Sequence, residues 1–236
     1  MYIIQLLKNG GDSFSREGLL NVGAFIIALL CALILHEIAH GLVALWFGDT
    51  TARDYGRLSL NPARHFDWMG LAMMLLCGFG WAKPVPVNTS NFKNKKLGMI
   101  CVSLAGVVTN LIVAFLFAGV SALAYSSLGY QIYQTSYYLW WFVVMLGELG
   151  TMLNISFACF NILPLYPLDG YRLLSCYIPQ DNAFLTFLRR YSTYILLGFI
   201  VLGYVFPAIS PLSRFINWGQ TTLGGAFESF WRLFIK

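Results

Sequence analysis

Two histidines and a glutamate stand within five residues of one another inside a long apolar stretch. They are His36, Glu37 and His40, in the run HEIAH. On a helix, positions i and i+4 share a face, so both imidazoles can bind one metal ion. The Glu37 carboxylate would lie beside that ion, where it could polarise a water molecule. This is the H-E-x-x-H pattern of zinc hydrolases.

The apolar surroundings strengthen this interpretation. Placing one charged side chain at bilayer depth costs about 2.5–3.5 kcal/mol on insertion scales. Ionisable groups in such a segment therefore need a compensating role. The alternative is a buried polar cluster that only holds helices together.

A catalytic zinc site needs a third protein ligand, with the fourth position open to water. Asp169 is the strongest candidate, because it follows an apolar segment expected to return to the same side of the membrane as HEIAH. Pro164 and Pro167 would interrupt that helix and direct the carboxylate inward. The alternative is that Asp169 only caps a turn before Gly170. We expect one zinc ion as the cofactor, bound by the two imidazoles and this carboxylate.

The composition indicates a protein built into a lipid bilayer. Of the 236 residues, 58% are hydrophobic and 11% are charged, and the mean hydropathy is +0.67. Soluble domains average about 25% charged residues. The net charge of +5 does not indicate a nucleic-acid partner, because the basic residues lie in short loops between apolar segments. We expect one membrane-embedded domain over residues 1–236.

Four apolar stretches are long enough to cross the hydrocarbon core as helices. They are residues 19–47, 97–125, 137–163 and 191–209. The predicted fold class is an all-α polytopic membrane protein, a bundle of about four to six membrane helices. A shorter stretch, residues 68–82, is expected to be re-entrant or half-buried.

The remaining segments are expected at the membrane surface. Residues 1–18 and the tail 212–236 are predicted to lie in the interface. Weak alternation over residues 55–60 and the proline-stiffened run 81–88 predict a small membrane-associated β element on the cytosolic side.

Charge in the connecting segments sets the expected orientation. Residues 48–67, 83–96 and 170–190 carry most of the arginines and lysines, whereas residues 126–136 carry no charge. By the positive-inside rule the three basic segments face the cytosol. We therefore expect a multi-pass protein of a prokaryotic cytoplasmic membrane, with its active site toward the cytosolic side.

Five blocks of the sequence follow one another in a distinctive order. They are HEIAH (36–40), GRLSLNPARHFDWMG (56–70), GWAKPVPVN (80–88), SLAGVVTN (103–110) and NILPLYPLDG (161–170). Together they resemble the short form of the site-2 protease family of intramembrane zinc metalloproteases. The resemblance implies that His36, His40 and Asp169 bind zinc and that Glu37 is the catalytic base. Val107 and Trp68 stand where the family usually has proline, outside that ligand set.

The resemblance also implies a substrate, a single-pass transmembrane protein cut in or near its transmembrane helix. Asn161 would hold the substrate or its developing oxyanion, although it could instead satisfy carbonyls freed by the broken helix. A membrane-associated loop would let the unwound substrate add as a strand. Its residues here are Pro84, Val85, Pro86 and Val87.

Three further polar residues have alternatives that the sequence leaves open. Asn110 is a candidate for substrate contact, but with Gly106 it suits a small-residue packing face equally well. Glu148, in the middle of an apolar span, is either functional or protonated against a neighbouring helix. His65 is expected to be a loop histidine bonded to Asp67.

Two other functional classes remain possible at this stage. A metal transporter would also place histidine and aspartate in a membrane, but residues 110–147 offer little polar path to the far side. A catalytically inactive relative would bind transmembrane helices without cutting them, and the intact HEIAH and LDG runs argue against it. The sequence predicts no oligomeric state.

Overall fold

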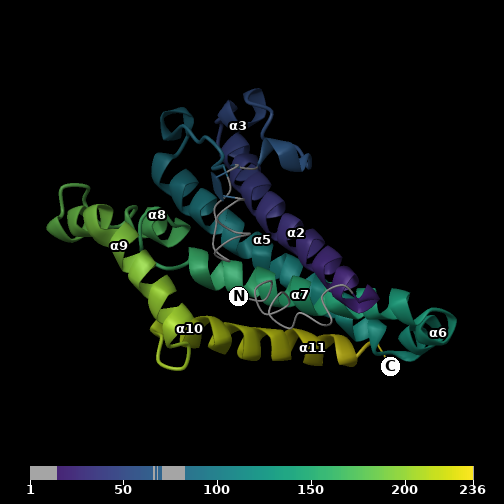
Figure 1. The fold of residues 1–236 in the computed structure, drawn as a ribbon. Helices are drawn as coiled ribbons and strands as arrows, with labels where there is room; N and C mark the ends of the chain where they lie inside the picture. The colour runs from purple at the N-terminus through teal and green to yellow at the C-terminus, as the bar shows by residue number, and fades with distance from the viewer. Residues whose placement is uncertain (1–14, 66, 68, 71–82, 236) are drawn as a thin grey trace.

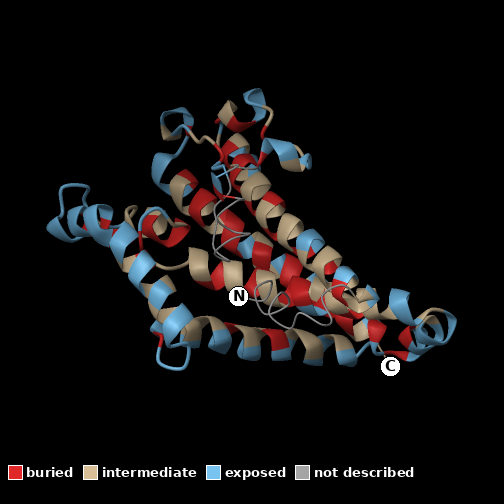
Figure 2. Cartoon of the chain, viewed as in Figure 1, coloured by how far each residue is buried: buried red, intermediate tan, exposed pale blue. Residues whose placement is uncertain are grey.

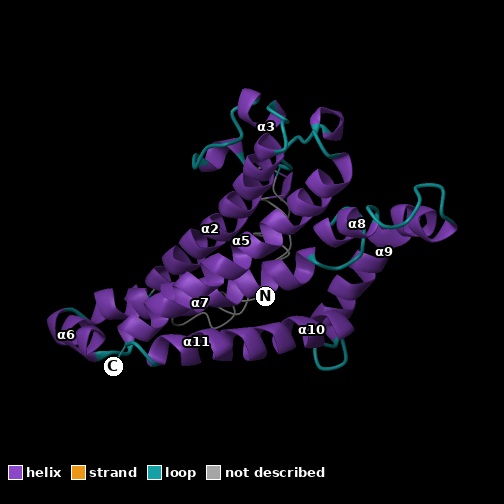
Figure 3. Ribbon diagram, turned by 180° about the vertical axis from the view of Figure 1, so that it is seen from behind, coloured by secondary structure: helices purple, strands orange, loops and turns teal. Residues whose placement is uncertain are grey.

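The computed structural model describes residues 15–65, 67, 69–70 and 83–235, which form helices joined by short connections (Figure 1). No β-strand occurs in these residues (Figure 3). The α-helices are α2 (Arg16–Trp46), α3 (Thr51–Asp54), α5 (Lys95–Ala124), α6 (Ser127–Thr135), α7 (Tyr137–Asn161), α8 (Asp169–Leu174), α9 (Ala183–Val205), α10 (Pro211–Gly219) and α11 (Gly225–Arg232). Short 3₁₀ turns are η1 (Pro62–Arg64) and η2 (Thr89–Asn91), and η3 (Gln220–Gly224) is a π-helical turn between α10 and α11.

Helices α2, α5, α7 and α9 are long and apolar enough to cross a membrane, which confirms the all-helical membrane class. A polar side chain caps the first turn of each, from Ser15, Asn94, Ser136 and Asn182. The cap at Asn182 explains why α9 begins ahead of its apolar run. Gly48, with φ of 104°, follows the end of α2, and glycine adopts this left-handed conformation readily.

Helices α2, α5 and α7 pack against one another, and their facing sides carry most of the buried residues (Figure 2). Ala24, Ala28 and Ala32, four residues apart on α2, are fully buried. On α7, a Cβ at Gly147 would lie 2.6 Å from the main-chain nitrogen of Ser121 on α5. Small residues therefore let the three backbones approach closely.

The C-terminal tail is helical and packs along α5 and α7. The indole nitrogen of Trp231 donates to the carbonyl oxygen of Phe115 at 2.8 Å. At the other end of the tail, a Cβ at Gly219 would lie 2.4 Å from the Sγ of Cys159. The interfacial position expected for residues 212–236 stays a prediction.

The predicted β element is absent from the described residues. Residues 55–60 turn instead of extending, because Gly56 adopts a φ of 65°. Residues 83–88 lie in neither a helix nor a strand. Pro84 and Pro86 favour an extended backbone there. Pro84 and Pro86 have no N–H to donate, which explains the missing ladder.

Three other expectations meet different outcomes. Residues 126–136, expected to be a loop, form the short helix α6 because the Ser126 hydroxyl caps it. The His65 ring contacts the carbonyl oxygen of Ser59 at 2.6 Å and not Asp67. The predictions for residues 71–82 and 1–14 lie outside the described part of the chain.

Candidate metal centre

The two histidines lie where α2 and α5 pack side by side. His36 and His40 are four residues apart on α2, and the residues that they contact on α5 are also four residues apart. The His36 ring occupies the space left by the missing side chain of Gly106, since a Cβ there would lie 2.3 Å from the ring. One turn along, His40 contacts the main chain of Val102. The i, i+4 spacing on each helix therefore brings both imidazoles to one place.

The hydrogen bonds of the two Nδ1 atoms determine that Nε2 of each histidine can bind a metal ion. Nδ1 of His40 lies 2.7 Å from the carbonyl oxygen of Val102, which can only accept, so this nitrogen carries the proton. Nδ1 of His36 lies 2.6 Å from Oδ1 of Asn110. In the neutral rings both Nε2 atoms then present lone pairs, and these two atoms are 3.0 Å apart.

The orientation of Asn110 is itself determined by its neighbours. Its amide nitrogen donates to the carbonyl oxygen of Ala32 at 3.0 Å and to Oδ1 of Asn154 at 2.9 Å. The Asn154 amide nitrogen donates in turn to the carbonyl oxygen of Gly150 at 2.8 Å. Both asparagines are fully buried. A chain of amides from α7 through α5 thus holds the His36 ring in place.

Asp169 reaches the histidines because the chain breaks after α7 and restarts as α8. A Cβ at Gly170 would lie 2.1 Å from the carbonyl oxygen of Ile162, so the start of α8 packs directly on the end of α7. Tyr171 is buried with Leu185, Leu188 and Leu196 of α9, which anchors the short helix. These contacts hold the carboxylate facing α2.

The three side chains form a compact cluster of acceptor atoms. Oδ2 of Asp169 lies 3.3 Å from Nε2 of His36 and 3.1 Å from Nε2 of His40. One ligand atom from each residue lies within 4.8 Å of the others. All three residues are buried.

This donor set fits a zinc ion. The buried Oδ2 of Asp169 has no hydrogen-bond partner among the described residues. A carboxylate and two imidazole lone pairs repel one another unless a cation lies between them. Two nitrogens and one carboxylate oxygen are ligands that zinc commonly takes.

Glu37 is oriented by a hydrogen bond from a segment distant in sequence. Its Oε2 accepts from the main-chain nitrogen of Val85 at 3.0 Å. The buried Arg57 donates to the carbonyl oxygens of Lys83 and Pro84 and interacts electrostatically with Glu37. One carboxylate oxygen is thus occupied, and Oε1 remains for chemistry.

The far end of the same extended segment is held by Asp49, just beyond the end of α2. Its carboxylate accepts from the main-chain nitrogen of Asn88 at 2.7 Å and from the Asn91 amide at 2.8 Å. Lys93 also donates its main-chain N–H to the carbonyl oxygen of Phe47 at 3.0 Å. Residues 83–93 are therefore fastened along the end of α2 that carries HEIAH.

Of the predicted site residues, the structure brings together His36, His40 and Asp169. Asn110 contacts His36, so it has a positioning role, and a direct substrate contact stays a prediction. The Asn161 amide donates to the carbonyl oxygen of Phe157 at 3.1 Å, and its catalytic role likewise stays a prediction. Residues 84–87 lie beside Glu37 through Val85.

Sequence reasoning missed three contributors. Asn154 carried a usable signal, because an amide in an apolar span needs a partner. Arg57 lay in a polar loop where nothing marked it as buried. The carbonyl of Val102 belongs to the main chain, so no residue type could indicate it.

Comparison with known proteins places the chain among peptidases. The family model described as "Peptidase family M50" matches residues 24–202. The protein named "Putative zinc metalloprotease YwhC" of Bacillus subtilis is 38% identical over 202 residues, covering 84% of this chain and 86% of the relative. "Putative zinc metalloprotease Rip2" of Mycolicibacterium smegmatis is 26% identical over 229 residues, covering 89% and 82%. No solved structure matches.

Proposed function

The chain belongs to peptidase family M50, and from this premise we propose that it cleaves membrane proteins as an intramembrane zinc metalloprotease. The observation that carries the proposal is the convergence of His36, His40 and Asp169 beside Glu37, inside a helical bundle of membrane-spanning length. The names of the two relatives described above supply independent support for zinc-dependent proteolysis.

The chain's own residues divide the chemistry among them. His36, His40 and Asp169 would hold zinc, which when bound acts as a Lewis acid toward a water molecule and the scissile carbonyl. Glu37 takes a proton from the attacking water at Oε1 and later delivers it to the leaving amine. The Val85 N–H keeps Oε2 fixed during this transfer. Asn110 keeps the His36 ring from rotating.

The proposed substrate is the transmembrane helix of a single-pass membrane protein. A helical peptide bond is enclosed in its own hydrogen bonds, so the helix must unwind before attack. Residues 84–87 support this step, because they are extended and lie beside the proposed base. We also propose that Asn161 contacts the substrate and that the active site opens toward the cytosolic side.

The test is to compare the wild type with Glu37→Gln in proteoliposomes that contain a library of single-pass transmembrane peptides. Mass spectrometry should find new peptide ends only with the wild type, whereas both proteins should retain zinc. Cleavage by the Gln variant would contradict the mechanism. Zinc uptake into the vesicles without cleavage would favour a transporter, and peptide binding without cleavage an inactive relative.

A further inference from the structure

A cavity of about 190 Å³ lies beside the proposed reaction centre. Its walls come from three elements, namely the extended segment at residues 85–89, the first part of α5, and α8. All three of these elements also hold or carry proposed catalytic or ligand groups. The cavity is therefore part of the same structural unit as the cluster.

Each of three site side chains contacts a residue that lines this cavity. The main-chain nitrogen of Val85 donates to Glu37 at 3.0 Å. The carbonyl oxygen of Val102 accepts from His40 at 2.7 Å. A guanidinium nitrogen of Arg172 lies 3.8 Å from Oδ1 of Asp169. A single lining residue therefore separates the cavity from each of these three side chains.

The lining is mostly apolar but contains one buried hydroxyl. Val85, Val87, Met99 and Val102 supply the apolar walls. The Ser103 side chain is 1% exposed, and its Oγ has no hydrogen-bond partner among the described residues. A buried hydroxyl without a partner is unfavourable, so this group is suited to an occupant that supplies one.

We propose that this cavity is a specificity pocket that receives an apolar side chain of the substrate next to the scissile bond. The inference rests on the proposed proteolytic function. Ser103 contributes to the wall of the pocket, at the level of Val102 on α5. Arg172 lies at the mouth with its side chain 39% exposed, and its positive charge disfavours lysine and arginine at this substrate position.

The size of the cavity supports a branched aliphatic or phenyl side chain. An apolar cavity of about 150 Å³ in another protein admits benzene, and this one is somewhat larger. Alanine would leave most of the space empty. Selection by size should therefore favour leucine, isoleucine or phenylalanine over alanine.

The experiment fills the pocket and measures selectivity. The cut made by the wild type in one transmembrane peptide is mapped by mass spectrometry, and the residues flanking it are varied in turn. At one flanking position, kcat/KM should favour leucine over both alanine and lysine. Ser103→Leu should lower kcat/KM for the leucine peptide about 10- to 100-fold. For the alanine peptide, kcat/KM should change less than about 3-fold, because the alanine side chain leaves the pocket empty in the wild type as well.

Three controls separate selectivity from misfolding. Val108→Leu places the same side chain on the exposed side of α5 and should leave the preference unchanged. Val87→Phe fills the cavity from the segment at residues 85–89 and should shift selectivity in the same direction, even if Ser103→Leu proves unstable. Ser103→Ala keeps the space and should leave the order of side chains unchanged.

The outcomes distinguish this inference from the proposed function. If the wild type cleaves but both filling variants keep its preference, or lose all substrates equally while retaining zinc, the pocket is not a specificity site. A wild-type preference for charged residues would overturn the inference as well. If the wild type cleaves no peptide in the library, the proposed function fails and the inference fails with it.

Discussion

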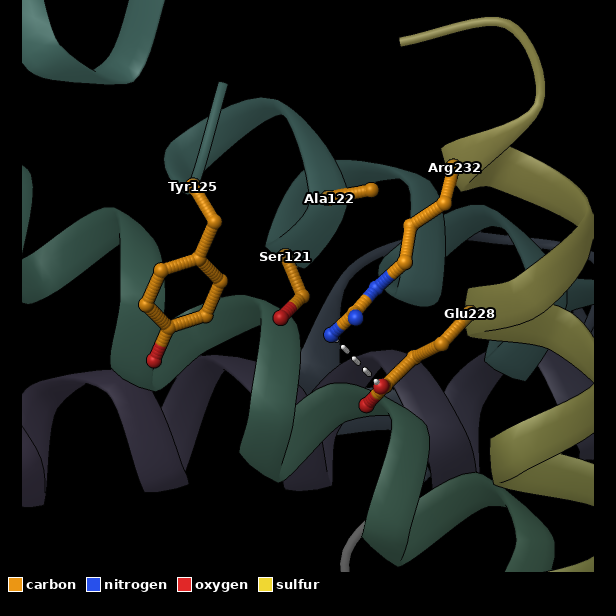
Figure 4. A pocket seen from close by; sticks show the side chains of 5 residues that line it. All are labelled: Ser121, Ala122, Tyr125, Glu228 and Arg232. Carbon is orange, nitrogen blue, oxygen red and sulfur yellow. Dashed lines mark ion pairs between the residues drawn. The ribbon is translucent and has the colours of Figure 1, made fainter. Parts of the chain in front are cut away.

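Two polar clusters lie toward opposite ends of the α5 helix. One pairs donors with acceptors, whereas the other brings acceptor atoms together. At the cluster of Ser121, Tyr125, Glu228 and Arg232 (Figure 4), Glu228 and Arg232 of α11 form an ion pair at 3.6 Å and line a cavity of about 30 Å³. The Tyr125 hydroxyl donates to Glu148 at 2.7 Å. Burial and this hydrogen bond raise the pKa of Tyr125 to about 12, so the hydroxyl stays a donor. In this cluster each charged side chain has a partner of opposite charge or a hydrogen-bond donor.

At the metal centre the arrangement is reversed. Three acceptor atoms face one another, and every donor in contact with the two rings or with Asn110 points outward to a carbonyl or amide oxygen. The far cluster pairs its own charged groups, whereas the three acceptor atoms of the centre would be stabilised by a bound cation. This contrast, and not polarity as such, distinguishes a site from a structural cluster.

The largest predicted effect comes from removing a ligand. His40→Ala should reduce zinc content below one ion per chain and lower cleavage by more than about 100-fold, because even the partners of ligands account for 10- to 100-fold. Elemental analysis and the peptide assay measure both. At the other cluster, Glu228→Gln should leave both quantities within about 2-fold of the wild type, since exposed ion pairs contribute little. Equal losses in the two variants would remove the contrast.

A smaller effect is expected from the groups that orient the ligands. Asn110→Leu should weaken zinc affinity by about 10- to 100-fold, because the His36 ring loses its acceptor. Competition with a chelator of known affinity measures this. Tyr125→Phe deletes a hydrogen bond of the far cluster and should leave zinc affinity unaltered. A normal affinity for Asn110→Leu would show that the amide chain does not position His36.

Packing between α2 and α5 gives the next test. Gly106→Ala places a Cβ into the His36 ring, so it should destabilise the protein by about 1–3 kcal/mol and weaken zinc binding. Gly225→Ala, in α11, meets nothing within 4 Å and should be neutral or stabilise by about 0.5–1 kcal/mol. Thermal unfolding in detergent with and without zinc compares the two. Similar unfolding curves for the two variants would mean that α2 and α5 can move apart at Gly106 without loss of stability.

The smallest effect concerns acid stability at the anchor of the extended segment. Burial raises the pKa of Asp49, but hydrogen bonds from Thr51, Asn88 and Asn91 outweigh it and hold the pKa below its usual range. The stabilisation is therefore present above the unfolded pKa of about 3.9 and is lost as pH falls through the folded value. Asp49→Asn should flatten the acid limb of the unfolding midpoint measured against pH. An unchanged slope in Asp49→Asn would contradict this assignment.

The meeting of His36, His40 and Asp169 could be predicted from the sequence because spacing and environment both constrain it. Two histidines four residues apart need a common partner, and an aspartate after a broken helix can reach them. The membrane helices followed from apolar length alone. Boundaries were less accurate where a capping side chain, such as Asn182, extended a helix beyond its apolar run.

The surroundings of the cluster could not be predicted in the same way. The contact between Glu37 and Val85 joins residues 48 positions apart through a main-chain N–H, which has no signature in the sequence. The predicted strand at residues 55–60 was wrong because Gly56 adopts a left-handed conformation that weak alternation does not reveal. The position of a segment that is held by tertiary hydrogen bonds can be read from the structure but not from the sequence.

X-ray absorption at the zinc edge of the purified protein in detergent tests the central claim most directly. The account predicts about one zinc per chain with two imidazole ligands and otherwise oxygen ligands. Asp169→Ala should lose the ion, or retain it weakly with both imidazoles still bound. Sulfur in the coordination sphere, a single imidazole, or undiminished zinc affinity in Asp169→Ala would contradict it.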